Sequence, residues 1–193
     1  MTRATTNLAA MVVACMVSFA VPATAKTYAD FRVGKLQGKL IVQWLEPDKF
    51  LFIPDENNPL TFTRYDGTVI RPGKMITDGG SIPRPIWILR NYSPWGYAPA
   101  FIIHDWLFVV KQCNLRGFEG YSHHDAANVM GEVMKTMMES GRVDIDKSTL
   151  LSMYLAVNSP IAGKLWANGP CVPPPAGANP KPAIAEYTLD FGN

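Results

Sequence analysis

The apolar residues of this chain change their spacing once, near residue 85, and this change limits the fold more than any other feature. The segment before it contains short apolar runs of strand length, bounded by turn residues, with a tight hairpin signal at Asp66-Gly67. These runs are Leu40–Leu45, Lys49–Ile53, Leu60–Tyr65 and Thr68–Ile70. From residue 97 onward the apolar residues recur at helical spacing. Strands followed by helices, rather than alternating with them, predict an α+β fold with a small N-terminal antiparallel β-sheet.

Three helices are expected after the strands, at about 99–111, 123–141 and 147–157, and Pro160 marks the end of the third. The second helix has apolar residues at positions i, i+3, i+4, i+7, i+8 and i+11, which places them on one face. They are Ala126, Val129, Met130, Val133, Met134 and Met137. The connection between the first two helices is short, so we expect these helices to pack as antiparallel neighbours.

The N-terminus has the three parts of a secretory signal peptide. Arg3 is the only charge in residues 1–25, an apolar run follows from Leu8 to Val21, and Ala23-Thr24-Ala25 ends the segment. We therefore predict cleavage before Lys26 and a periplasmic or secreted protein. The alternatives are an uncleaved anchor and a lipoprotein modified at Cys15. No other apolar stretch is long enough to cross a membrane, so we expect no transmembrane anchor after cleavage.

The composition of the mature chain restricts its partners. Removing 25 residues leaves 193 − 25 = 168, which suits one domain at 26–169, followed by a Pro-rich strap at 170–193. The mature chain has 17 Lys and Arg against 16 Asp and Glu, without a basic stripe, which argues against nucleic-acid binding. Its two cysteines, Cys113 and Cys171, favour a disulfide over two free buried thiols in an exported protein.

All three histidines fall between residues 104 and 124, and each lies beside or near a carboxylate. His104 and Asp105 share one helix face with Phe101 and Phe108, so that face is expected to be partly buried. If the first two helices are antiparallel, Asp125 can face His104. Asp125 would then orient His104 as a general base, and these two are the candidate catalytic residues. Asp105 would remain free to bind a hard cation such as calcium.

Other interpretations of the same residues remain open. Ser122-x-x-Asp125 before an apolar run is also a capping box, so Asp125 could serve only the helix start. His104 and Asp105 could be a hydrogen-bonded core pair, because buried polar pairs also occur for structure alone. A transition metal on His104, Asp105 and a second-helix histidine such as His124 is a further possibility, although no H-E-x-x-H spacing supports it.

The segment Thr77–Arg84 is a second candidate for ligand contact. Gly79 and Gly80 let the backbone approach a ligand, and Asp78 and Ser81 place polar groups in the same loop. Its alternative is an ordinary strand-to-helix turn. A serine nucleophile is disfavoured, because no G-x-S-x-G elbow surrounds Ser81. The candidate substrate-binding residues are Gly79, Gly80, Ser81 and Trp106, and the candidate metal ligands are Asp105, Asp78 and His124.

Three segments together resemble the bacterial and phage family called domain of unknown function 1353. They are the loop Thr77–Pro83, the run His104–Phe108, and Asp125 at the start of an apolar helix. The pattern of that family is a T-D-G-A-S-I-P loop, an H-D-[YW]-L-[YF] helix and an A-D-x-x-F helix. The resemblance covers about residues 30 to 160. The chain departs from the pattern at Gly80, His124 and Asn128. The resemblance implies a fold family and carries no activity.

Four residues are also similar in type and order to secreted prokaryotic phospholipases A2: His104, Asp105, Phe108 and Asp125. The similarity implies that Asp125 orients His104 to activate water, and that Asp105 holds calcium together with a glycine-rich loop, for which residues 78–81 would stand. The chain has Phe108 where a tyrosine is usual and lacks the core cysteine framework of those enzymes.

These observations predict an exported hydrolase that uses a His-Asp dyad to activate water. Its substrate would be a phospholipid or another cell-envelope ester or amide, and calcium is the candidate cofactor. The alternative is a non-catalytic exported module for binding or envelope assembly, in which the His/Asp cluster is structural.

Overall fold

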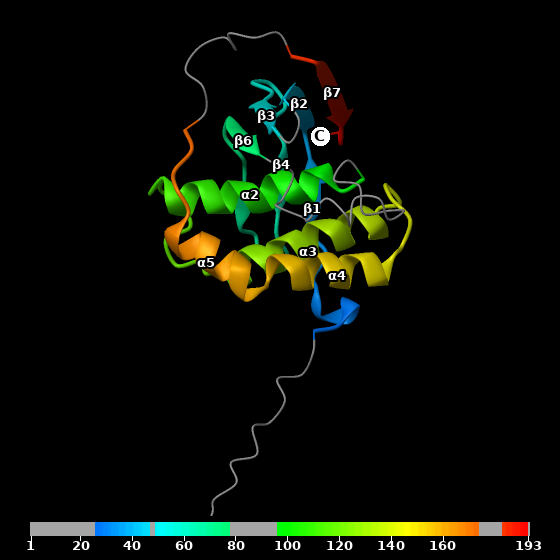
Figure 1. Ribbon diagram of the computed structural model, residues 1–193. Coiled ribbons are helices and arrows are strands. Elements are labelled where there is room, and N and C mark those ends of the chain that lie inside the picture. Colours follow the sequence, from blue (N-terminus) through cyan, green and yellow to red (C-terminus); the bar gives the residue numbers. More distant parts are fainter. Residues whose placement is uncertain (1–25, 47–48, 78–95, 174–182, 193) are drawn as a thin grey trace, which may run out of the picture.

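The fold is α+β, as the sequence predicts. The computed structural model describes residues 26–46, 49–77, 96–173 and 183–192, and within them it contains two antiparallel sheets and a group of α-helices (Figure 1). A short 3₁₀ helix, η1 (Tyr28–Asp30), precedes the first strand. The predicted signal peptide lies outside the described residues. Within the described residues, no helix is long and apolar enough to cross a membrane.

The strands form a three-stranded and a four-stranded sheet. The three-stranded sheet has the order β1 (Lys35–Gln37), β4 (Thr61–Thr63), β5 (Val69–Ile70). The four-stranded sheet has the order β6 (Met75–Thr77), β3 (Lys49–Pro54), β2 (Lys39–Glu46), β7 (Ala185–Asp190). The central hairpin β2–β3 pairs Val42 with Phe52, and both side chains are buried. Such pairs of β-branched and aromatic residues stabilise neighbouring strands and fix their register.

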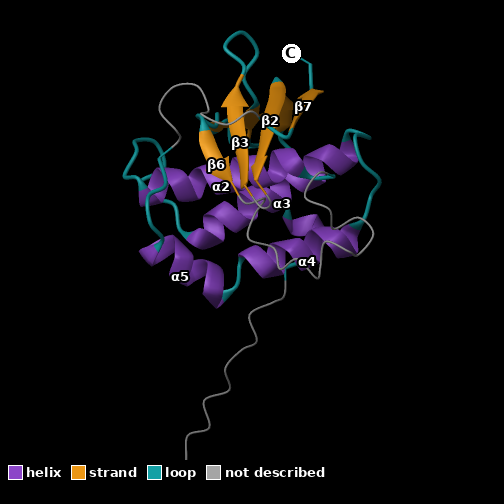
Figure 2. Cartoon of the chain, turned by 45° about the horizontal axis from the view of Figure 1, so that its top comes forward, coloured by secondary structure: helices purple, strands orange, loops and turns teal. Residues whose placement is uncertain are grey.

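Among the described residues, four α-helices follow: α2 (Ala98–Gln112), α3 (His123–Glu139), α4 (Lys147–Val157) and α5 (Pro160–Asn168). The predicted apolar stripe of α3 is buried along its whole length, with exposures of 3% or less. It packs against α2, and the two helices lie side by side in opposite directions (Figure 1), which confirms the predicted antiparallel pair. In Figure 2 the four-stranded sheet lies above α2 and α3, whereas α4 and α5 lie on the side away from it.

Two elements differ from the prediction. Pro160 does not only follow α4, because it also occupies the first turn of α5, where proline is well tolerated and Ser159 caps the helix. The three-helix unit expected from the sequence therefore has a fourth helix. The tail is also more than a strap, since β7 pairs with β2 from Lys39↔Asp190 to Trp44↔Ala185.

A disulfide joins Cys113, just after α2, to Cys171, just after α5. The two Cα atoms lie 4.7 Å apart, within the range that disulfides need, which confirms the predicted bridge. The bridge closes a loop with a sequence separation of 58 residues and holds the end of the helical unit against α2.

Candidate functional site

His104 and Asp105 form a hydrogen-bonded pair in the middle of α2. His104 Nδ1 lies 3.0 Å from Asp105 Oδ1. His104 is 4% exposed, and the Asp105 side chain is 17% exposed. Consecutive helix residues do not normally face each other, so the contact requires the His104 ring to turn toward its neighbour. The described structure therefore gives His104 a carboxylate partner from its own helix.

Thr77 joins this pair from the sheet. It is the last residue of β6, it is buried, and its hydroxyl donates a hydrogen bond to Asp105 Oδ2. Both oxygens of Asp105 therefore accept hydrogen bonds, one from His104 and one from Thr77. The carboxylate links α2 to β6 and is held from both sides. Thr77 is also the first residue of the sequence segment that contains Asp78, Gly79, Gly80 and Ser81. Those four candidates lie outside the described residues.

The second ring nitrogen of His104 is the exception in this network. Nε2 is buried and has no hydrogen-bond partner among the described residues. An ionised carboxylate can only accept, so Nδ1 must donate to Asp105, and in the neutral ring Nε2 then carries the lone pair. The Phe108 ring lies 4.9 Å from the His104 ring between centroids, and Trp166 of α5 packs edge-on against Phe108 at the same distance.

Asp125 makes no hydrogen bond to His104 among the described residues, so the structure does not show the predicted contact between them. Asp125 accepts hydrogen bonds from the backbone N–H and the hydroxyl of Ser122, at 2.8 and 2.6 Å. This is the capping box, and it directs the carboxylate back along the start of α3. Burial opposes ionisation of Asp125, but the hydrogen bonds from Ser122 and the nearby charge of Arg64 outweigh it and lower the pKa of Asp125.

Sequence analysis missed a buried ionic cluster on the α3 face that carries Asp125. Arg64, just after β4, donates to both carboxylate oxygens of Glu132, with N···O distances of 2.7 and 2.8 Å. Arg64 also donates to the Tyr121 hydroxyl at 2.9 Å. The hydrogen bonds to Glu132 raise the pKa of Arg64. Glu132 is 5% exposed, and a buried charge needs a partner, but it lies off the apolar stripe of α3, so helical spacing did not mark it as buried.

His123 and His124 lie at the start of α3, and their contacts are separate from those of the His104–Asp105 pair. Their ring centroids are 3.8 Å apart, and exposed His124 hydrogen-bonds to Asn158 at the end of α4. Burial, followed by the neighbouring His124, lowers the pKa of His123. In the part of the chain that the structure describes, no three His, Cys, Asp or Glu side chains converge as metal ligands. The structure pairs His124 with Asn158, and the proposed metal ligand set stays a prediction.

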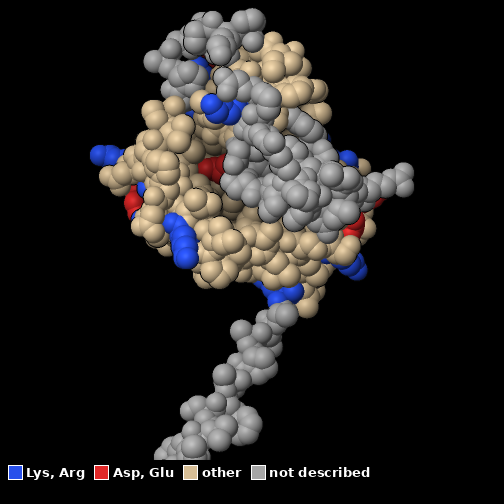
Figure 3. All heavy atoms as spheres, viewed as in Figure 1, with Lys and Arg blue, Asp and Glu red and all other residues tan. Residues whose placement is uncertain are grey.

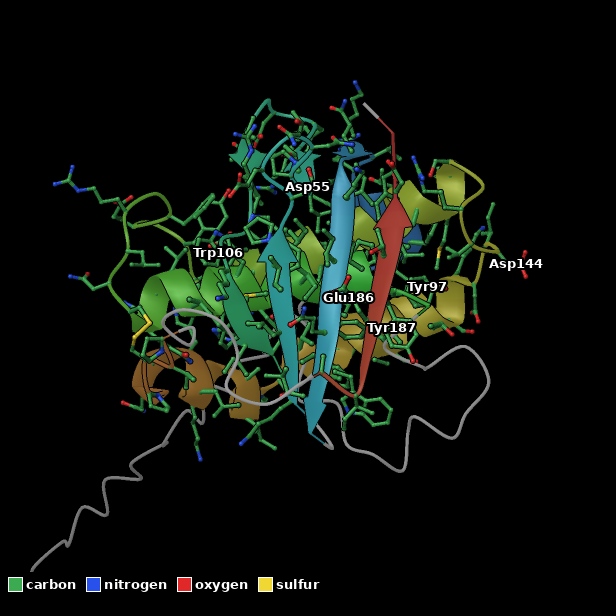
Figure 4. The ribbon with its side chains drawn as sticks, turned by 90° about the horizontal axis from the view of Figure 1, so that it is seen from above. Asp55, Tyr97, Trp106, Asp144, Glu186 and Tyr187 are labelled. Carbon is green, nitrogen blue, oxygen red and sulfur yellow. A yellow bond between two sulfur atoms is a disulfide. The ribbon has the colours of Figure 1, made fainter. Side chains whose placement is uncertain are left out.

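Trp106 lies one residue beyond the pair and is partly buried. A Cβ atom on Gly73 would lie 2.7 Å from the Trp106 ring, so the ring rests directly on the backbone that leads into β6. Figure 4 shows Trp106 beside the β6 edge of the four-stranded sheet. Basic and acidic residues are scattered over the face shown in Figure 3, and acidic atoms lie in a hollow at the level of α2.

The segments that contain Thr77 and the His104–Asp105 pair fall within one family match. The family model described as "Protein of unknown function (DUF1353)" matches residues 57–157, which is more than half of the chain. The match includes Thr77, His104 and Asp105. No curated protein and no solved structure matches the chain, so the similarity to phospholipases A2 stays a prediction. The chain belongs to the family of proteins of unknown function designated DUF1353.

Proposed function

We propose that the protein is an exported hydrolase in which His104 is the general base and Asp105 orients it. The observation that carries this proposal is the state of the two ring nitrogens. Nδ1 is fixed by Asp105, whereas the buried Nε2 has no partner among the described residues. Asp105 replaces Asp125 in the role that the sequence suggested, and it is supported in turn by Thr77.

The energetic cost of a buried nitrogen without a partner favours a functional role for Nε2. Leaving a buried acceptor unpaired costs about 1–3 kcal/mol, and few buried polar groups in proteins are left in this state. A general base needs a lone pair that no protein group occupies, together with a partner that fixes the other nitrogen. Among the described residues, both conditions hold at His104. Phe108 packs against the His104 ring and Trp166 packs against Phe108, and at 4% exposure electrostatic interactions of the ring are weakly screened.

In the proposed reaction, Nε2 takes a proton from water as the water oxygen attacks the carbonyl carbon of an ester or amide. Asp105 stabilises the imidazolium that forms, and Thr77 keeps the carboxylate in place. The imidazolium then returns the proton to the leaving oxygen or nitrogen as the carbonyl re-forms. A phospholipid or another envelope ester or amide would suit the aromatic surroundings of His104.

Calcium stays a proposal for Asp105 with Asp78. Calcium takes six to eight oxygen ligands, and both oxygens of Asp105 already accept hydrogen bonds. The described residues therefore do not make a calcium site by themselves, and no step above uses a cation. The assay below includes calcium as a separate variable.

The test uses the mature chain, residues 26–193, with fluorogenic phospholipids and esters, with and without calcium. H104Q should lower hydrolysis by about a hundredfold or more, and D105N by a similar factor, while circular dichroism stays unchanged. H123Q is the matched control, because His123 makes no bond to this pair. Wild-type hydrolysis by a folded H104Q protein would contradict the proposal. N-terminal sequencing of the exported protein should begin at Lys26.

The alternative is a non-catalytic exported module. Its support is that Thr77 and Asp105 join β6 to α2, which a purely structural network would also do. In that case H104Q and D105N would lower the free energy of unfolding, and no substrate in the panel would be hydrolysed by the wild-type chain.

A further inference from the structure

The outer side of α4 and α5 exposes large apolar side chains. Leu155 is 65% exposed, Ile161 72%, Leu165 43% and Val172 47%. These four residues, called here the α5 face, come from the last turn of α4, from α5, and from the segment just after it. Ile161 and Leu165 are four residues apart and share one side of the helix. Figures 1 and 2 show that α4 and α5 lie on the outside of the helical unit, away from the four-stranded sheet.

The exposed positions around the α5 face are also mostly apolar. Between residues 155 and 173, the exposed residues are Leu155, Ala156, Pro160, Ile161, Lys164, Leu165, Ala167, Asn168, Pro170, Cys171, Val172 and Pro173. Lys164 is the only charged side chain in this set. Scattered exposed apolar residues are normal, but a run of this kind on one segment is typical of an interaction surface.

Fixed contacts hold this segment in place. The disulfide from Cys171 to Cys113 ties its end to α2. Gln112 donates a hydrogen bond to the Leu165 carbonyl at 3.2 Å, and Trp166 is buried against Phe108 on the opposite side of α5. The apolar side chains are therefore presented to solvent by an ordered helix and are not exposed through fraying of a chain end.

The charge pattern points to the chemistry of the partner. Residues 147–185 contain no Asp or Glu, although an even distribution of the 16 acidic residues would put about three there. The charged residues of this stretch are Lys147, Lys164 and Lys181. Exposed Lys111 in the last turn of α2 and Arg116 on the loop after it add positive charge, and Glu119 on that loop adds one negative charge.

We propose that the α5 face binds an anionic lipid surface. Apolar side chains on a helix whose one charged residue is a lysine can enter the boundary between headgroups and acyl chains while Lys164 meets phosphate groups. A symmetric dimer through the same face is disfavoured, because a two-fold axis there would bring Lys164 toward its own copy. This proposal does not depend on the proposed hydrolysis, since it concerns a surface outside the His104 pair.

Vesicle sedimentation tests the proposal with the mature chain. The protein should bind vesicles of phosphatidylcholine with phosphatidylglycerol, bind pure phosphatidylcholine vesicles at least tenfold more weakly, and dissociate as salt rises. I161S/L165S should weaken binding to the anionic vesicles at least tenfold, and K164E should weaken it severalfold. V69S is the matched control, because Val69 is 51% exposed on β5 and lies outside the α5 face.

Three results would overturn the proposal. They are equal binding by I161S/L165S and the unmodified chain, no binding to anionic vesicles, and light scattering that shows a dimer which I161S/L165S abolishes. Each variant changes an exposed side chain, so circular dichroism should show an intact fold. H104Q should bind vesicles like the unmodified chain, so loss of hydrolysis and loss of lipid binding can be told apart.

Discussion

Removing one partner of the Arg64–Glu132 ion pair should destabilise the protein strongly. The Arg64 side chain is 13% exposed and the Glu132 side chain 6%, and two hydrogen bonds join them in a bidentate arrangement. In E132L the Arg64 guanidinium would remain buried without its carboxylate. Breaking such a buried pair costs about 3–5 kcal/mol, because the remaining charge has lost water and gains no replacement.

The surroundings of Arg64 place the expected cost at the lower end of that range. Asp66 Oδ2 lies 3.7 Å from Arg64, and the Tyr121 hydroxyl accepts a hydrogen bond from it, so part of the stabilisation survives. We expect E132L to lower the free energy of unfolding by about 3 kcal/mol. The double variant R64M/E132L removes both charges, and apolar replacements of similar size are often neutral, so it should regain about 2 kcal/mol of that loss.

Urea unfolding followed by far-UV circular dichroism measures both effects with the disulfide intact. For a protein of residues 26–193, a loss of about 3 kcal/mol corresponds to a decrease in Tm of about 6–12 °C. R64M alone completes the double-mutant cycle and gives the coupling energy directly. A loss below about 1 kcal/mol in E132L, or a double variant as unstable as the sum of the two single variants, would refute this reasoning.

Three further changes have defined outcomes. Replacing Cys113 and Cys171 with serine should lower the free energy of unfolding by about 2–4 kcal/mol in urea, since chain entropy alone gives about 4 for this loop; an unchanged midpoint would contradict that. G131A should destabilise by about 1–2 kcal/mol in thermal unfolding, because its Cβ would lie 2.2 Å from the buried Phe31 ring and this overpacking exceeds the gain of about 0.5–1 in helix propensity; a higher Tm would show that the ring moves freely. The pKa of Asp125 is lower in the folded state than in the unfolded state, where it is near 3.9. The ionised carboxylate therefore stabilises the fold above about pH 3.9, and this stabilisation is lost as the pH falls through the lower folded-state pKa. D125N should therefore cost about 1 kcal/mol at pH 7 and less below pH 4, whereas an equal loss at pH 7 and pH 3 would contradict this linkage.

The helices that the sequence predicted well are those defined by local signals. The third expected helix, residues 147–157, matches α4 at both ends. Asp146 caps its start, and Pro160 follows its end. The missed helix α5 begins with Pro160, a residue that follows one helix and starts the next. A proline therefore marks a helix boundary, but the sequence around it does not show whether a second helix begins at that boundary.

The remaining differences come from contacts between distant parts of the chain. β7 pairs with β2 across more than 140 residues, and a Pro-rich segment separates it from the helices. Its own residues, such as Tyr187 and Leu189, suit a strand, but nothing local shows which strand they join. The Arg64–Glu132 pair spans 68 residues, and the spacing of apolar residues gave no sign of it, because Glu132 lies off the apolar stripe of α3.

The candidate site shows the same division between local and distant information. Sequence placed His104 and Asp105 on a buried helix face and recognised Ser122-x-x-Asp125 as a capping box, and both features are present. It could not decide whether Asp125 served the cap or His104, because that depends on how the start of α3 meets α2. In the structure Asp125 accepts two hydrogen bonds from Ser122, as the cap requires, and Asp105 is the carboxylate that contacts His104.

The contact between Thr77 and Asp105 explains how two separate sequence segments act as one unit. Thr77 ends β6 and begins the glycine-containing segment, while Asp105 follows His104 on α2, and a hydrogen bond joins them across 28 residues. A structural role would need only this bond, because it already links sheet to helix. It would not need His104 beside Asp105, nor a buried Nε2 that meets no described partner. The difference between T77V and H104Q therefore separates the two roles. Both variants remove a hydrogen bond to Asp105 and should lower the free energy of unfolding in either case, whereas only a catalytic His104 makes a folded H104Q protein lose hydrolysis by about a hundredfold or more.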